Sequence, residues 1–149
     1  MPDTLADRLA LLAQAFNEQR LDVPSGLLDR ACVFRLNGVA YEDTMGRPVS
    51  DPIVRLVARG PAGYRFLAQA LRYAIPDARV LIEDVVPADA GGRLASATVA
   101  VEGTPRGSSA PWRAGVAVAL VIGAEGLVQE LAAMMEERHV EAIREARRR

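Results

Sequence analysis

The 149-residue sequence has a single cysteine, Cys32, and a single histidine, His139. One cysteine cannot form an intramolecular disulfide, a cysteine-based zinc site or a redox pair. One histidine excludes a histidine metal cluster and most Ser-His-Asp arrangements. We therefore expect a protein that binds no metal and needs no other cofactor.

Lysine is absent, so all 18 basic residues are arginine, and with 19 acidic residues the net charge is −1. This balance argues against the positive surface with which nucleic-acid-binding proteins neutralise phosphates. No apolar run is long enough to span a membrane, and the N-terminus lacks the pattern of a signal peptide. The sequence therefore predicts a cytoplasmic protein that binds neither nucleic acid nor membranes.

Half of the residues are hydrophobic and a quarter are charged, as in an ordinary globular protein. A chain of this length can bury the core of one domain. Because the sequence shows no internal repeat and no linker, we expect a single domain over residues 1–149. Residues 138–149 are rich in charge and predict a solvated C-terminal tail that includes His139.

The stretch 112–135 predicts a long β-hairpin around which the other elements are arranged. In residues 112–122 bulky and small side chains alternate, so Trp112 and the other bulky residues share one face. Residues 123–126 carry the glycines of a tight turn. Residues 127–135 have the composition of a helix, but we predict a strand because the first strand requires a partner.

The remaining elements precede this hairpin. Thr4 and Asp7 resemble a capping pair at the start of an amphipathic helix that runs from Leu5 to about Arg20. The other expected elements are a short helix over 24–29, a strand over 31–36, a turn at Asn37–Gly38, a short strand over 41–43, an apolar edge segment over 53–57, a helix over 61–74, and strands over 79–86 and 94–102. Loops over 87–92 and 104–111 connect the long strands.

The order of these elements resembles the nuclear transport factor 2-like superfamily, which includes ketosteroid isomerases, SnoaL-like polyketide cyclases and limonene-type epoxide hydrolases. The resemblance implies an α+β fold in which a strongly curved antiparallel sheet wraps around N-terminal helices to form a cone. The inside of that cone is an apolar pocket with a few polar groups, suited to a small ligand. The motifs that carry it are Leu28-Asp-Arg-Ala-Cys-Val-Phe34, Gly60-Pro-Ala-Gly-Tyr64, Ala74-Ile-Pro-Asp77 and Gly126-Leu-Val-Gln-Glu130.

Within that superfamily the chain is most similar to the small epoxide hydrolases and cyclases of polyether biosynthesis, and this similarity implies two acidic residues. Glu102, in Val101-Glu102-Gly-Thr-Pro105, stands where those enzymes carry an acid before a Pro-Gly segment. Asp43, in Tyr41-Glu42-Asp43-Thr44, resembles the second acid, although a threonine replaces the expected proline. If Phe34-Arg-Leu36 is the aligned strand instead, Arg35 takes the place of that acid.

Two carboxylates that face one apolar pocket are suited to acid–base chemistry. Burial raises the pKa of one so that it donates a proton, while the other stays ionised as the base. Opening an epoxide needs such a pair, since one group protonates the leaving oxygen and the other activates water or an internal hydroxyl. The resemblance thus makes Asp43 and Glu102 the candidate catalytic residues. The alternative is that Glu102 ends a strand at the surface and Asp43 lies in a solvated loop.

Seven further residues are candidates for contacts with a substrate. Tyr41 either shares a strand face with Asp43 and orients a substrate oxygen, or is an exposed loop residue. Trp112 either walls the mouth of the pocket or, as we prefer, packs in the core or at an interface. Glu83 and Asp84 are expected to point to opposite faces of a regular strand, so at most one of them faces the pocket. The seven candidates are Arg35, Asn37, Tyr41, Tyr64, Asp84, Trp112 and Met134.

Three functions are consistent with these features. The first is a cofactor-independent enzyme of secondary metabolism that acts on a hydrophobic polyketide- or terpene-like substrate by epoxide hydrolysis, cyclisation or isomerisation. We prefer this first function. The second is a non-catalytic protein of the same fold that binds a small hydrophobic ligand, and it is supported by the third acid of limonene-type hydrolases, which falls on Ala132 or Ala133. The third is an accessory subunit of a biosynthetic complex. By resemblance we also expect a homodimer that packs through the small-residue face of Gly115, Ala117 and Ala119.

Overall fold

The computed structural model describes residues 4–87 and 93–149, so residues 88–92 of one predicted loop lie outside the described part. None of the described helices is long and apolar enough to cross a membrane. The elements in chain order are α1 (Leu5–Asn17), β1 (Leu28–Leu36), β2 (Val39–Ala40), the 3₁₀ helix η1 (Tyr41–Thr44), α2 (Pro52–Ala58), α3 (Gly60–Ala74), β3 (Arg79–Val86), β4 (Leu94–Gly103), β5 (Trp112–Ile122), β6 (Val128–Met134) and α4 (Glu137–Arg147).

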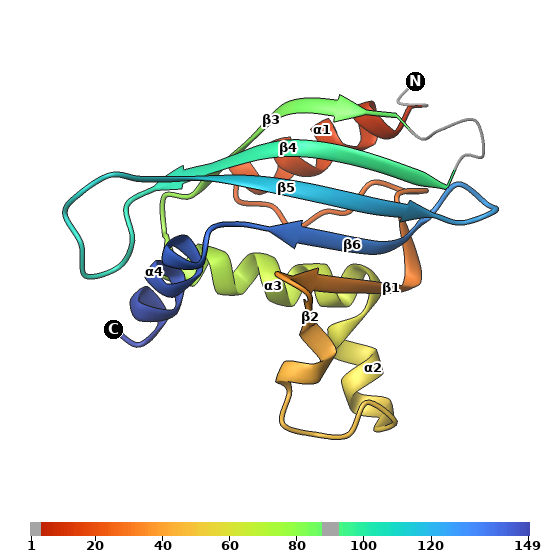
Figure 1. Ribbon diagram of the computed structural model, residues 1–149, viewed down its shortest axis with the longest axis horizontal. Coiled ribbons are helices and arrows are strands. Elements are labelled where there is room, and N and C mark those ends of the chain that lie inside the picture. The colour runs from red at the N-terminus through yellow and green to blue at the C-terminus, as the bar shows by residue number, and fades with distance from the viewer. Residues whose placement is uncertain (1–3, 88–92) are drawn as a thin grey trace.

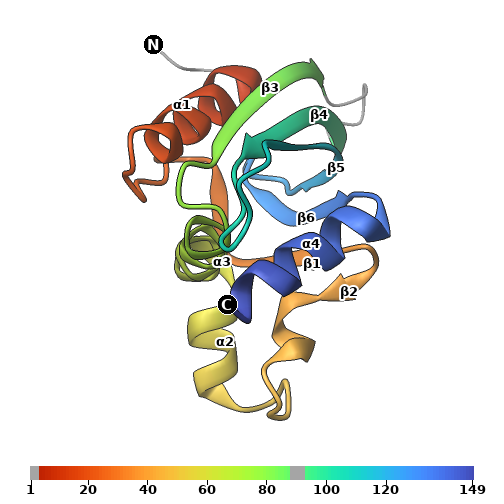
Figure 2. The ribbon, with the colours of Figure 1, turned by 90° about the vertical axis from the view of Figure 1, so that its left-hand side faces the viewer.

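The six strands form one sheet in the order β2-β1-β6-β5-β4-β3. All neighbouring strands are antiparallel except β1 and β6, which run parallel. Helices α1 and α3 lie along one face of this sheet, and α4 lies against α3 beside β1 and β6 (Figure 1, Figure 2). The predicted α+β class is confirmed. The predicted cone goes further than the structure, because the sheet is an open layer whose edge strands are β2 and β3.

The β5–β6 hairpin is confirmed, including the strand character of its helix-like second arm. Leu120 pairs with Leu131 across the two strands and is fully buried. Gly126 adopts a φ of +80° in the connecting turn, a value that glycine accepts and other residues rarely do. Ala117 and Ala119 are exposed on the opposite face of β5. The homodimer expected across that face stays a prediction.

Two local predictions at the N-terminal half are also confirmed. Thr4 caps α1, since its Oγ1 accepts a hydrogen bond from the backbone N–H of Asp7 at 3.1 Å. Asn37 and Gly38 have φ values of +49° and +86°, which are the left-handed angles of a tight hairpin turn. This turn reverses the chain from β1 into β2.

Two segments between α1 and α2 differ from the prediction. Residues 24–29 do not form a helix, because β1 already begins at Leu28, which is buried and pairs with Val128 of β6. Residues 41–43 belong to η1 rather than to a strand. In both places a long-range contact of the segment, not its local pattern, decides the backbone conformation.

Two further segments are helices where the sequence predicted an apolar edge segment and a charged tail. Residues 53–57 lie in α2, because the Asp51 carboxylate accepts a hydrogen bond from the backbone N–H of Ile53 at 2.9 Å and so caps a helix that begins with proline. Most of the charged C-terminal stretch is α4, which buries Val140 and Ala146. The C-terminal stretch is therefore part of the folded domain.

Candidate functional site

A cavity of about 240 Å³, which we call the inner cavity, lies between α1, α3 and the sheet. Its walls are apolar because helical spacing and strand alternation direct hydrophobic side chains to this side of each element. Among the described lining residues, Tyr64 is the one with a polar side chain. The lining residues are Leu9, Leu12, Ala13, Phe16, Tyr64, Leu67, Ala68, Leu71, Val80, Ile82, Ala97, Val99, Val118 and Leu131.

Tyr64 on α3 carries the one side-chain hydroxyl among the residues that line the inner cavity. Burial raises the pKa of this phenol to about 12, and the positive charge of Arg72 offsets only part of that effect. The hydroxyl is therefore protonated at neutral pH and able to donate one hydrogen bond. Within residues 4–87 and 93–149 it has no hydrogen-bonding partner.

A larger cavity of about 560 Å³, which we call the outer chamber, adjoins the inner cavity. Leu67 of α3 and Leu131 of β6 line both spaces. A volume of this size falls in the range of about 300–1,000 Å³ typical of small-molecule sites. The polar lining residues are Arg35, Asn37, Tyr41, Thr44, Glu137, Arg144 and Arg147, and the apolar ones are Phe34, Leu36, Val39, Leu67, Ala70, Leu131, Ala133, Val140 and Ile143.

The two candidate catalytic acids lie on different parts of the molecule. Glu102 of β4 accepts a hydrogen bond from Arg113 of β5 at 2.7 Å. Its neighbour Val101 is buried, so alternation along the strand places Glu102 on the face away from the inner cavity. Asp43 is exposed on η1, next to the edge strand β2, and the strands β1, β6 and β5 separate β2 from β4. The structure therefore does not bring these two acids together as an acid–base pair.

This placement leads to a first prediction. Asp43→Asn and Glu102→Gln should each change the free energy of unfolding by no more than about 0.5 kcal/mol, because both carboxylates are solvated. Urea unfolding at pH 7 measures the change. If either variant gained more than about 1 kcal/mol in its free energy of unfolding, the replaced acid would be strained in a pocket. That result would support a catalytic role for the acid.

Three of the predicted substrate contacts do line the outer chamber, but two of them already have partners. Arg35 forms an ion pair with Glu130 of β6. The side-chain amide of Asn37 donates to the carbonyl of Met135 and accepts from its N–H, both at 2.9 Å, and so fixes the turn to the chain after β6. Burial raises the pKa of the Tyr41 phenol, while the positive charge of Arg147 lowers it. Only Tyr41 of the three presents an uncommitted polar group.

Two other candidates, Asp84 and Met134, lie on the face of the sheet away from the inner cavity and the outer chamber. The pairing of β3 with β4 shifts between Ile82 and Asp84, so the strand is irregular at Glu83. Both Glu83 and Asp84 are exposed. The strand is therefore not regular here, so the condition under which the two side chains were expected to point to opposite faces is not met. Met134 is 63% exposed. These side chains do not reach the inner cavity or the outer chamber.

Trp112 lines neither cavity and packs in a core region between β5 and α4. The Trp112 ring meets the His139 ring edge-on, with 5.5 Å between the ring centroids. The Trp112 Nε1 and the His139 Nδ1 are both buried, and neither has a hydrogen-bond partner among the residues that the structure describes. The prediction that His139 lies in a solvated tail is therefore wrong.

An ion pair that the sequence did not predict, between Arg59 and Glu42, supports the outer chamber. Arg59, which precedes α3, donates from Nε and Nη2 to the two carboxylate oxygens of Glu42 at 2.5 and 3.1 Å. Glu42 belongs to η1 and is buried, and such a bidentate, charge-assisted pair fixes both groups. Because Glu42 follows Tyr41, the pair also holds this tyrosine beside the chamber. No local spacing signals a pair whose members are 17 residues apart.

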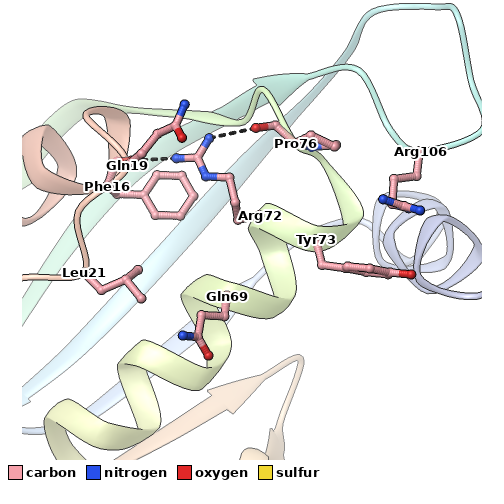
Figure 3. A pocket seen from close by; sticks show the side chains of 8 residues that line it. All are labelled: Phe16, Gln19, Leu21, Gln69, Arg72, Tyr73, Pro76 and Arg106. Atoms are coloured by element: carbon pink, nitrogen blue, oxygen red, sulfur yellow. Dashed lines mark hydrogen bonds between the residues drawn. The ribbon is translucent and has the colours of Figure 1, made fainter.

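Arg72, which the sequence analysis did not single out, links α3 to the end of α1 and to the segment before β3, at one end of the inner cavity. Its guanidinium donates to the carbonyls of Phe16 at 2.5 Å, Ala78 at 2.9 Å and Pro76 at 3.2 Å. It also lies over the Phe16 ring, 4.3 Å from the centroid, and Figure 3 shows it between the end of α1 and the end of α3. Burial lowers the pKa of Arg72. The residue thereby holds α1 and α3 in the positions that frame the cavity.

No protein-family model and no curated protein matches the chain. Solved structures do match it. A SnoaL-like protein from Jannaschia sp. CCS1 is 12% identical with a TM-score of 0.65, over 93% of this chain and 90% of that one. An NTF2-like protein of unknown function from Exiguobacterium sp. 255-15 is 16% identical with a TM-score of 0.60, over 90% and 99%.

The epoxide hydrolase/cyclase-like enzyme SalBIII is also similar in structure, with 12% identity and a TM-score of 0.60 over 90% of this chain and 92% of that one. All three likenesses span at least nine tenths of this chain. At such low sequence identities a structural likeness establishes the fold but not the activity, which has to be argued from the residues of the site. The chain has the NTF2-like, SnoaL-like fold.

Proposed function

We propose that this protein binds a small hydrophobic molecule in the inner cavity, between the sheet and helices α1 and α3. The observation that supports this proposal most strongly is the apolar lining, which comes from four strands and two helices and includes the single hydroxyl of Tyr64. An apolar surface gains about 25 cal/mol for each Å² that it removes from water. A hydrophobic ligand is therefore the occupant that such walls favour.

The lining also limits what the ligand is. A charged group inside the inner cavity would lose its hydration without gaining a partner, which costs several kcal/mol. One oxygen that accepts a hydrogen bond from Tyr64 would fix the orientation of an otherwise apolar molecule. Polyketide- and terpene-like molecules have this character, with an extended or fused hydrocarbon frame and few oxygen atoms.

A second candidate function is catalysis on such a molecule, and Tyr64 is the residue that favours it. A protonated phenol in an apolar site can donate a hydrogen bond to a carbonyl or epoxide oxygen and so stabilise the charge that develops there. This role replaces the acid–base pair of Asp43 and Glu102. Turnover of a panel of epoxides and enones that disappears in Tyr64→Phe would support catalysis, whereas binding without turnover supports the first candidate.

The binding proposal predicts the effect of filling the cavity. Val118→Phe on β5 should weaken binding of the neutral fluorophore N-phenyl-1-naphthylamine at least tenfold, because the added ring occupies the space of the ligand. The matched control is Ala117→Val, which adds bulk to the exposed face of the same strand and should leave the affinity unchanged. Fluorescence titration measures both affinities, and thermal melts verify that each variant is folded. Equal affinities of the Val118→Phe variant and the wild type would refute the inner cavity as the binding site.

A further inference from the structure

We infer that the ligand carries an anionic group, with a carboxylate as the simplest case, and that Arg147 and the hydroxyl of Tyr41 bind this group in the outer chamber. This inference rests on the proposed function, because it assumes that the apolar part of the same ligand occupies the inner cavity. It adds the chemical class of the ligand and its direction in the site.

The two cavities adjoin in a way that suits an amphipathic molecule. Leu67 and Leu131 line both spaces, so the inner cavity and the outer chamber are neighbours across these two side chains. The inner cavity is apolar except for one hydroxyl, whereas the outer chamber combines an apolar floor with charged residues. A hydrocarbon body in the first and a polar head in the second would each meet a matching surface.

Helix α4 places its arginines beside this floor. Val140, Ile143, Arg144 and Arg147 follow the spacing i, i+3, i+4, i+7, so they share one face of the helix. All four line the outer chamber. The apolar pair covers the floor, and the arginine pair stands further along the helix towards its C-terminal end.

The arginines of the chamber differ in how far they are already neutralised. Arg35 is paired with Glu130, and Arg144 lies 3.4 Å from both Glu137 and Glu141. Arg147 forms no ion pair and no hydrogen bond with any residue in the described part of the chain. Its positive charge is therefore the one left without a protein partner among the three.

The acidic residue of the chamber does not supply that partner either. Glu137 accepts hydrogen bonds from Asn37 Nδ2 at 3.2 Å and from Arg144 at 3.4 Å, and thus is already engaged. Arg147 and Tyr41 line the same chamber. Burial raises the pKa of the Tyr41 phenol, and the positive charge of Arg147 offsets part of that effect. A guanidinium with an adjacent phenolic O–H is a donor set that suits a carboxylate, because the fork of arginine matches its two oxygens.

The test compares an acid with its uncharged ester in displacement of N-phenyl-1-naphthylamine at pH 8. Dodecanoic acid should bind the wild type at least tenfold more tightly than methyl dodecanoate. Arg147→Gln should abolish that difference by weakening the acid and leaving the ester unchanged, and Tyr41→Phe should weaken the acid about threefold. The matched control is Arg148→Gln, because Arg148 is the next arginine along but is paired with Glu141 and Glu145 outside the chamber. It should retain the full preference.

The outcomes separate this inference from the function on which it rests. Equal affinities of the wild type for acid and ester would overturn the inference, while the effect of Val118→Phe would still support the inner cavity. An equal loss in Arg147→Gln and Arg148→Gln would also overturn it, since the acid would then respond to the general charge of the C-terminus. Failure of the fluorophore itself to bind the wild type would overturn both proposals. Circular dichroism verifies that α4 persists in each variant.

Discussion

Replacing Arg72 with leucine is expected to lower the free energy of unfolding by about 3 kcal/mol. The guanidinium satisfies three backbone carbonyls, those of Phe16, Pro76 and Ala78. Hydrogen bonds from a charged donor contribute about 1.5–3 kcal/mol each. The bonds to Phe16 and Ala78 are half-buried and fall at the lower end of this range, and the exposed bond to Pro76 contributes little. Loss of the contact with the Phe16 ring adds to the effect. The end of α1 and the start of β3 would lose a common anchor.

Urea unfolding of Arg72→Leu, Arg72→Lys and Arg65→Leu measures this contribution. Arg65 is exposed on the same helix, so Arg65→Leu should change stability by less than about 0.5 kcal/mol. Arg72→Lys should fall between the two, because one ammonium group cannot reach three carbonyls with the geometry of a guanidinium. A loss below about 1 kcal/mol for Arg72→Leu would show that these carbonyls are satisfied by water, and that α1 is held by its apolar face alone.

The elements that could be predicted from the sequence are those whose local pattern and whose partner agree. β5 alternates small and bulky residues from Gly115 to Leu120, and its turn contains the glycine that the angles require. Its neighbour β6 has helix-forming residues, yet it is a strand because its Leu131 completes the core with Leu120. Pairing therefore outweighs intrinsic propensity there, as context generally does in sheets.

The elements that could not be predicted depend on contacts between distant parts of the chain. β1 begins three residues earlier than expected because Leu28 joins β6 in a parallel pairing, for which the sequence has no turn signal. α2 contains a β-branched run that favours a strand, although Asp51 and Pro52 are ordinary signals for the start of a helix. In α2 those terminal signals, rather than the propensity of the middle, predict the structure correctly.

In the candidate site, too, some features could be predicted from local sequence patterns and others depend on contacts between distant parts of the chain. Alternation along β4 already places Glu102 on the face opposite Val99 and Val101, so its distance from the cavity follows from the sequence once the strand is accepted. Arg147 shows the opposite case. Its role depends on α4 folding over the outer chamber, and the helix is too rich in charge for its few apolar residues to reveal that it is packed.

Tyr64 leads to the second large effect, which appears at alkaline pH. Its pKa is about 12 in the folded protein against 10 for an ordinary tyrosine, so the unfolded chain releases its proton first. Stability is complete below about pH 10 and is lost as the pH rises towards 12, because the unfolded state binds fewer protons there. Two pKa units correspond to about 2.7 kcal/mol, and partial solvent access reduces the expected loss to about 2 kcal/mol.

The tyrosine is isolated by making the comparison in a Cys32→Ala background, because burial also raises the pKa of the Cys32 thiol to about 12. In that background the protein that retains Tyr64 should lose about 1.4 kcal/mol more between pH 9 and pH 11.5 than the Tyr64→Phe variant, as measured by urea unfolding. Equal pH dependence of stability in the two proteins would mean that the Tyr64 hydroxyl is in contact with water. Such a hydroxyl would have to lose its bound water before it could orient a ligand. A steeper profile for the tyrosine would mean that the folded cavity keeps the phenol neutral, which is the state in which it donates a hydrogen bond. The pH dependence of stability therefore tests, without any knowledge of the ligand, whether the inner cavity has the dry character that both candidate functions need.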